Sequence, residues 1–330
     1  MFEYAELIIY LLIVLIAFWF AIAPHPSMSN GVKFLLYVFV SSCLSIVVRL
    51  SGFDIDIATY ADSMRFESIS FYYLREPVVW FGQRYLYSVL QSDVLVFILF
   101  DVFLLICVYA SFTKYRLPYY AFYAFLVFFP FIMGMQNVYR QWVSAIFCLL
   151  AFSYVFSNGS FTKRYGLYTL AGLSHNVAGL FLAPLFLMSK SFLERAAGFV
   201  VLALTPLLIL FAAGSKSAAS TGENLVVAYI ALLVVMVIFM ILSTRLRVNR
   251  HNRKSLGIAI FSIYLVFISS VILTSTGAER VGLFSLVLIY PHLVLFIERY
   301  YRQAFLLRAC LVVFGFAPIL IFGVRQFIVP

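Results

Sequence analysis

The stretch LVVAYIALLVVMVIFMILS, residues 225–243, contains no charged residue and is long enough to cross a bilayer as one helix. Similar runs recur along the whole chain of 330 residues, of which 65% are hydrophobic and 11% are charged. A soluble domain carries roughly 25% charged residues, so this chain cannot form a water-soluble surface. A transmembrane β-barrel is excluded, because its strands are about 10 residues long and alternate between apolar and polar residues, whereas the apolar runs here are longer and continuous. The sequence therefore predicts an all-α, polytopic membrane protein.

We expect about eleven hydrophobic segments in a single transmembrane domain that spans residues 1–330. Each segment approaches the roughly 20 residues that a helix needs to cross the bilayer. The expected segments are 7–23, 32–48, 93–112, 117–133, 141–157, 166–188, 197–213, 225–243, 255–274, 281–297 and 304–322.

Basic loops indicate which connections face the cytoplasm. Positive charges collect in four loops, a pattern typical of the cytoplasmic side of a membrane. These loops are 114–116, 163–164, 245–254 and 299–302. They account for much of the net charge of +10, so no nucleic-acid partner is expected.

One segment must enter and leave the membrane on the same side, because an odd number of segments separates the second and third basic loops. The first candidate is 165–189, which Ser174-His175-Asn176 interrupts near its middle. Polar breaks of this kind occur where protein or water satisfies the backbone. The alternative is 197–213, which contains a proline.

The long segment 49–92 then lies on the outer face, where it carries most of the outward charge and many aromatic residues. Apolar positions recur at helical spacing over 76–90, which predicts an amphipathic helix on the membrane surface. Its aromatic residues fit either an interfacial belt or a surface that stacks on sugar rings.

Three outward arginines are candidate ligands for an anion. Arg140 and Arg280 each open a predicted helix, where the helix dipole and free N–H groups already favour negative charge. Arg49 ends an outgoing helix. A guanidinium at such a position can bind phosphate or pyrophosphate through two hydrogen bonds. The alternative is contact with lipid headgroups alone.

Four further residues carry ionisable groups of interest. His175 and Asp101 lie within apolar stretches, where an ionisable residue indicates either function or a hydrogen bond between helices. Asp54 and Asp56 match the D-x-D element that many sugar transferases use for a divalent cation. Three letters often match by chance, so no cofactor and no metal are expected, and a divalent cation at this pair remains the alternative.

Five elements in order resemble the EpsG-like, Wzy-type polysaccharide polymerases. They span roughly residues 45–300 and match that family in sequence order and spacing. The elements are Arg49-Leu-Ser-Gly-Phe-Asp54-Ile-Asp56-Ile-Ala-Thr-Tyr60, Glu76-Pro-Val-Val-Trp-Phe81, Met135-Gln-Asn-Val-Tyr-Arg140-Gln141, Leu173-Ser174-His175-Asn176-Val-Ala178 and Glu279-Arg280.

The resemblance implies a GT-C-like helical bundle in the bacterial inner membrane, with its active face in the periplasm. Such enzymes polymerise undecaprenyl-diphosphate-linked oligosaccharides in O-antigen, capsule or exopolysaccharide assembly. They transfer the growing glycan from its lipid diphosphate to the non-reducing end of a new lipid-linked unit. Membrane lipids, a chain-length co-polymerase and a flippase are the further partners that the resemblance implies.

The resemblance and the charge pattern together select the candidate site residues. We expect His175, Asp56 and Arg280 to be catalytic, with either His175 or Asp56 as the base. The residues expected to bind the diphosphate or the glycan are Arg49, Tyr60, Glu76, Arg84, Arg140, Gln141 and Arg280. The alternatives are an O-antigen ligase, a glycosyltransferase that uses polyprenyl-phosphate sugars, a flippase for the lipid-linked unit, and a structural membrane subunit.

Overall fold

The computed structural model describes residues 4–24, 27–53, 55–65, 71–157, 159–189, 191–212, 224–244, 250–301 and 304–321. Every secondary-structure element in these ranges is a helix. The elements are α1 (Ala5–Ile22), α2 (Asn30–Ser51), α3 (Ile55–Arg65), the 3₁₀ helix η1 (Phe71–Arg75), α4 (Pro77–Leu90), α5 (Asp93–Tyr115), α6 (Tyr120–Leu126), α7 (Phe129–Gln136), α8 (Tyr139–Phe156), α9 (Phe161–Ser174), the 3₁₀ helix η2 (Asn176–Phe181), α10 (Leu182–Leu187), α11 (Phe192–Ala212), α12 (Val226–Ser243), α13 (Arg250–Ile272), α14 (Ser275–Tyr300) and α15 (Phe305–Ile321). Asp54, residues 245–249 of the third basic loop and Arg302 lie outside the described residues.

Within the described ranges, eight helices are long and apolar enough to cross a membrane. They are α1, α2, α5, α8, α11, α12, α13 and α14. The structure therefore confirms the prediction of an all-helical, multi-pass membrane protein. The count of eleven segments is not confirmed.

Three predicted segments do not form a single long apolar helix. The segment 117–133 divides into α6 and α7, because Phe128 is extended and Pro130 favours a helix start. The segment 166–188 divides at His175 into α9, η2 and α10, so the break lies at the predicted polar triplet. The segment 304–322 corresponds to α15, which has 17 residues.

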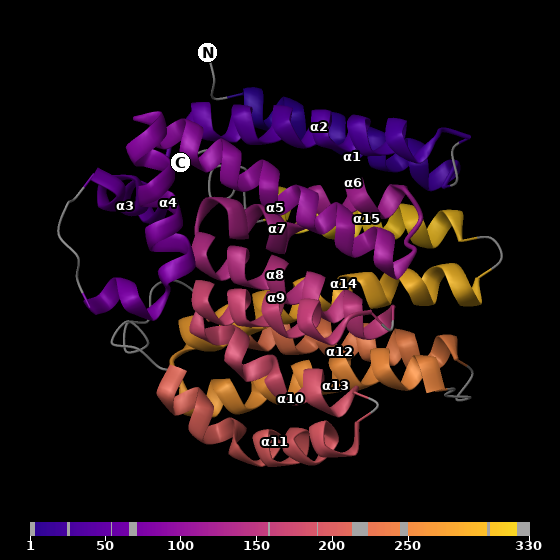
Figure 1. The fold of residues 1–330 in the computed structure, drawn as a ribbon. Coiled ribbons are helices and arrows are strands. Elements are labelled where there is room, and N and C mark those ends of the chain that lie inside the picture. Colours follow the sequence, from indigo (N-terminus) through magenta and orange to yellow (C-terminus); the bar gives the residue numbers. More distant parts are fainter. Residues whose placement is uncertain are drawn as a thin grey trace.

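The long helices run roughly side by side, and α3 and α4 lie together at one end of the bundle (Figure 1). The predicted amphipathic helix 76–90 corresponds to α4, which Pro77 opens and which contacts α5 and α9. We call the end that holds α3 and α4 the α3–α4 end. The helix α1 ends and the helix α2 begins at the opposite end (Figure 1).

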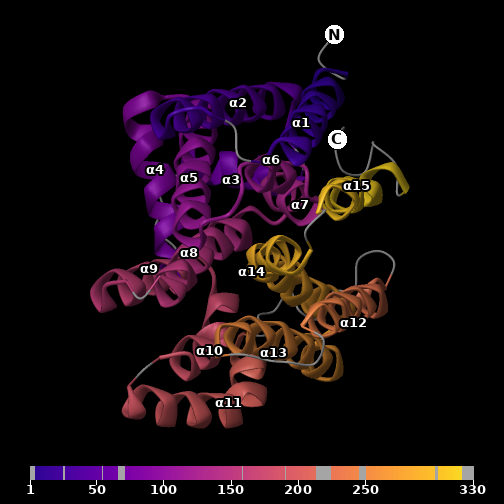
Figure 2. The same ribbon diagram turned by 90° about the vertical axis from the view of Figure 1, so that its right-hand side faces the viewer.

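Two helices form the centre of the bundle. Over the most apolar 18 residues of each helix, 83% of the residues are buried in α8 and 89% in α14. The corresponding share in α11 is 17%, so α11 lies at the periphery. Figure 2 shows α14 between the helices of the N-terminal half and the group formed by α10 to α13. Arg140 and Arg280 lie near the N-terminal ends of these two central helices, and both are partly buried there.

Candidate active site

The polar triplet ends α9 and exposes the side chain of His175 to a junction of several helices. His175 is extended between α9 and η2. The Ser144 hydroxyl of α8 donates to the carbonyl of Ala171 at 2.8 Å and lies 3.4 Å from the carbonyl of His175. The amide of Val177 donates to His175 Nδ1 at 3.2 Å. A neutral imidazole that accepts at Nδ1 carries its proton on Nε2. His175 Nε2 lies 3.6 Å from Glu76 Oε1.

Arg140 and Glu76 form the buried centre of this junction. Glu76 precedes α4, Arg140 lies in the first turn of α8, and Arg140 Nη1 donates to Glu76 Oε2. Arg140 Nε also donates to the Tyr60 hydroxyl at 3.2 Å, and its guanidinium carbon lies 5.0 Å from the centre of the Trp80 ring. The ion pair thus joins α3, α4 and α8, and His175 adds the break after α9.

Burial shifts the titration of both groups at the junction, which lie outside the eight long apolar helices. Burial raises the pKa of the Glu76 carboxyl, although the charge of Arg140 opposes this shift. Burial, together with the charges of Arg140 and Arg280, lowers the pKa of His175 to about 3. The imidazole is therefore neutral at pH 7, in agreement with its hydrogen bonds.

A small polar cavity of about 20 Å³ opens beside this junction. Its lining residues are Asp56, Tyr60, Val138, Arg140, Gln141, His175 and Arg280. Gln141 Nε2 donates to the backbone carbonyl of Arg280, which holds α8 and α14 together at the cavity. The Arg280 guanidinium forms no ion pair or hydrogen bond with any described residue. Its charge acts on Glu76 and His175 without a direct contact, so its guanidinium can bind an anionic ligand at the cavity.

A larger apolar groove adjoins the polar cavity. Its volume is about 470 Å³, and Phe129, Tyr229 and Phe314 contribute to its walls. Asp56, Val138 and Arg280 line both spaces. The groove and the cavity therefore meet at one cation and one carboxyl group. This arrangement suits an amphiphile whose charged group lies at Arg280 and whose apolar chain occupies the groove.

Seven of the nine predicted site residues come together here: Asp56, Tyr60, Arg140, Gln141, His175 and Arg280 line the cavity, and Glu76 contacts two of them. Arg84 does not line the cavity. Its Nε donates to the carbonyl of Ser63 at 3.0 Å and its guanidinium lies over the Tyr73 ring, so it fastens α4 to α3.

Arg49 lies in the last turn of α2, as predicted, but it is buried there and paired with an acid. Arg49 is 2% exposed. Its guanidinium pairs with Asp101 of α5 through Nε (2.8 Å) and Nη2 (3.1 Å). Nη2 also donates to the carbonyl of Met135, and the Tyr139 hydroxyl donates to Asp101. Ser45 adds a further hydrogen bond to the same carboxylate. The pair thus holds the turn that leads into Arg140, and we assign Arg49 to positioning rather than to ligand binding.

The apolar groove and the Arg49–Asp101 pair are the features that sequence reasoning missed. The signal for the pair was present, because Asp101 is an acid within an apolar span and needs a partner there. Among the described residues, no cluster of three or more His, Cys, Asp or Glu side chains could hold a metal ion. Asp54, one half of the D-x-D element, lies outside those residues.

Comparisons of this chain with protein families, with curated proteins and with solved structures find no match.

Proposed function

We propose that this chain polymerises undecaprenyl-diphosphate-linked oligosaccharides at the periplasmic face of a bacterial inner membrane. The observation that carries the proposal is the contact between the polar cavity and the apolar groove at Asp56, Val138 and Arg280. A ligand that fills both spaces has an anionic head and a long hydrocarbon tail. A polyprenyl diphosphate has this chemistry, with its phosphates at the guanidinium and its prenyl chain in the groove.

In the proposed reaction, a hydroxyl oxygen of the acceptor sugar attacks C1 of the glycan that is linked to the donor lipid. The new C1–O bond forms while the C1–O bond to the diphosphate breaks, and the lipid diphosphate leaves with the bonding electron pair. Arg280 can bind two phosphate oxygens at once and so stabilise the departing charge. Arg140 adds positive charge nearby, although Glu76 neutralises part of it.

Asp56 is the base that the geometry favours for the acceptor proton. Asp56 lines the cavity. His175 accepts a hydrogen bond at Nδ1 and therefore carries its proton on Nε2, which faces Glu76. It has no free lone pair there with which to take a proton from the acceptor sugar. His175 then orients the Glu76 carboxyl and, through it, Arg140. The Gln141 Oε1 atom is buried without a hydrogen-bond partner among the described residues, so it can accept a hydrogen bond from a sugar hydroxyl.

The test is elongation of lipid-linked repeat units by the purified protein in detergent, with the products separated by length. We expect a ladder of longer products from the wild type and none from Arg280→Ala. Arg280→Lys should restore little activity, because an ammonium cannot bind two phosphate oxygens in the fork geometry. Arg65→Ala is the matched control, since Arg65 pairs with Asp93 and is 56% exposed in its side chain.

Three outcomes would refute the proposal. If the protein moves lipid-linked units from one leaflet of a vesicle membrane to the other without lengthening them, it is a flippase. A protein that transfers glycan only to a different acceptor lipid is a ligase. Full elongation by Arg280→Ala would remove Arg280 from the site and, with it, the link between the cavity and the chemistry.

A further inference from the structure

A second cavity lies at the end of the bundle opposite the α3–α4 end. Its volume is about 420 Å³, and it lies where α2 begins and α5 ends. The 22 residues of α2 place Lys33, near its start, roughly 30 Å from the end of the helix that holds Arg49. This cavity is therefore separate from the site proposed for glycan transfer.

The cavity combines two cations with an aromatic floor. Lys33 and Arg116 line it, no acidic residue does, and neither side chain forms an ion pair with a described residue. Arg116 is exposed and Lys33 is half-buried, whereas Tyr119 and Phe122 are buried beneath them. The Tyr119 hydroxyl donates to the Lys33 carbonyl at 2.6 Å, which ties the floor to the first turns of α2. The cavity thus has a positive mouth and a rigid aromatic base.

The backbone of Arg116 sets the position of its side chain. Arg116 ends α5 in the left-handed conformation, with φ of 58°, and its amide donates to the carbonyls of Phe112 and Thr113. Glycine is the residue that adopts this conformation most readily, and a side chain there is disfavoured. The left-handed turn ends α5 at Arg116, whose side chain lines the cavity.

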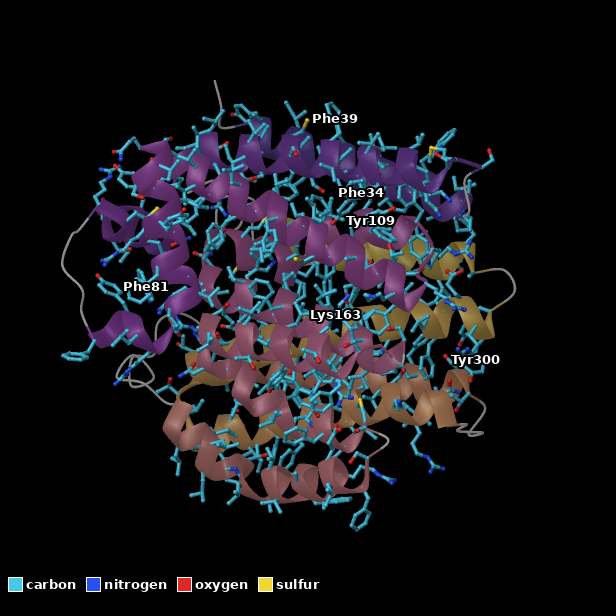
Figure 3. The ribbon with its side chains drawn as sticks, in the orientation of Figure 1. Phe34, Phe39, Phe81, Tyr109, Lys163 and Tyr300 are labelled. Carbon is cyan, nitrogen blue, oxygen red and sulfur yellow. The ribbon has the colours of Figure 1, made fainter. Side chains whose placement is uncertain are left out.

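An apolar face of α5 leads away from the cavity along the membrane-spanning part of the helix. Tyr109 and Thr113 line the cavity, and Ile106 and Val102 follow on the same face at helical spacing, within about 17 Å of Thr113 along the helix. Val102 and Ile106 are each half-buried. Figure 3 shows Tyr109 beside Phe34 of α2, and the two ring centres are 5.1 Å apart. A headgroup in the cavity can therefore be continuous with an acyl chain along α5.

We propose that this second cavity binds the headgroup of an anionic phospholipid. The two cations bind the phosphate, the aromatic residues contact the glycerol region, and the half-buried Val102 and Ile106 of α5 contact an acyl chain. The position of the cavity, at the ends of two helices long enough to cross the membrane, is the level at which phospholipid headgroups lie. This proposal does not depend on the reaction proposed for the other site.

The test is native mass spectrometry of the full chain in detergent, titrated with phosphatidylglycerol, with phosphatidylcholine or with inorganic phosphate. We expect the first phosphatidylglycerol to bind at least about tenfold more tightly than phosphatidylcholine. Lys33→Gln combined with Arg116→Gln should reduce its affinity by about tenfold or more. Lys33→Arg should retain it. Millimolar phosphate should not displace the lipid.

Lys114→Gln is the matched control, because Lys114 lies two residues from Arg116 but packs over the Tyr154 ring at 4.0 Å and does not line the cavity. Arg116→Gly is a second variant that relieves the backbone, so it should fold well and still lose affinity. Wild-type affinity in the double variant or in Arg116→Gly would overturn the proposal. Equal losses in Lys114→Gln, equal binding of phosphatidylcholine, or displacement by free phosphate would overturn it as well.

Discussion

Replacement of Asp101 by asparagine should strongly destabilise the protein, because it leaves a buried guanidinium without a counter-charge. The Asp101 carboxylate is fully buried and accepts hydrogen bonds from Ser45, from the Tyr139 hydroxyl and from two nitrogens of Arg49. In Asp101→Asn, the guanidinium keeps one amide oxygen and the carbonyl of Met135 as acceptors, but neither oxygen carries a charge, and the new NH₂ group cannot accept. Removal of one partner of a buried ion pair costs about 3–5 kcal/mol, and we expect a loss in this range.

The assay is equilibrium unfolding in mixed micelles by titration with sodium dodecyl sulfate, followed through helix content. Arg65→Ala serves as the control, because the Arg65 side chain is 56% exposed and ion pairs of exposed side chains contribute little to stability. The double variant Arg49→Met with Asp101→Leu should recover most of the stability, since it buries no charge.

Asp101→Asn should also lower elongation activity, because the Arg49–Asp101 pair holds the turn before Arg140. A loss below about 1 kcal/mol for Asp101→Asn would contradict this reasoning. So would a double variant that is less stable than the single one, because the destabilisation would then not come from the unpaired charge.

Three further predictions concern other parts of the chain. The pKa of His175 is about 3 in the folded protein and near 6.5 when unfolded, so only the unfolded state gains a proton as the pH falls below about 6.5. The free energy of unfolding of the wild type should therefore fall by up to about 2 kcal/mol between pH 7 and pH 5. In the same unfolding assay, the free energy of unfolding of His175→Gln should depend less on pH. Gly134→Ala places a methyl group against a buried tryptophan and should lower the free energy of unfolding by about 1–3 kcal/mol, whereas Gly172→Ala meets open space and should be neutral or stabilising. Cysteines introduced at 250 and 280 should react with a membrane-impermeant reagent from opposite sides of the membrane, and labelling from one side would overturn the predicted topology.

The sequence by itself determined the class of protein and the position of its main break. Uncharged runs such as 225–243 form helices wherever they lie in the chain, because an isolated apolar helix already satisfies its own backbone in a bilayer. The break at His175 was also predictable, since a polar triplet within an apolar run disfavours a continuous lipid-facing helix. The same local pattern could not show that 117–133 forms two short helices.

The sequence was also sufficient to predict most of the residues of the candidate site, because short motifs at helix ends tend to lie on one face of a bundle. It could not assign a partner to each charge. Three outward arginines looked equivalent, yet Arg49 pairs with Asp101, Arg140 pairs with Glu76, and Arg280 has no described partner.

Only the tertiary structure decided which acids pair with these arginines and what lies next to them. Glu76 and Arg140 are 64 residues apart, and the walls of the apolar groove come from α7, α12, α14 and α15. Hydropathy and helix-end patterns depend on neighbours along the chain. Ion pairing and cavity shape depend on distances between side chains on different helices, which the packing of the helices sets.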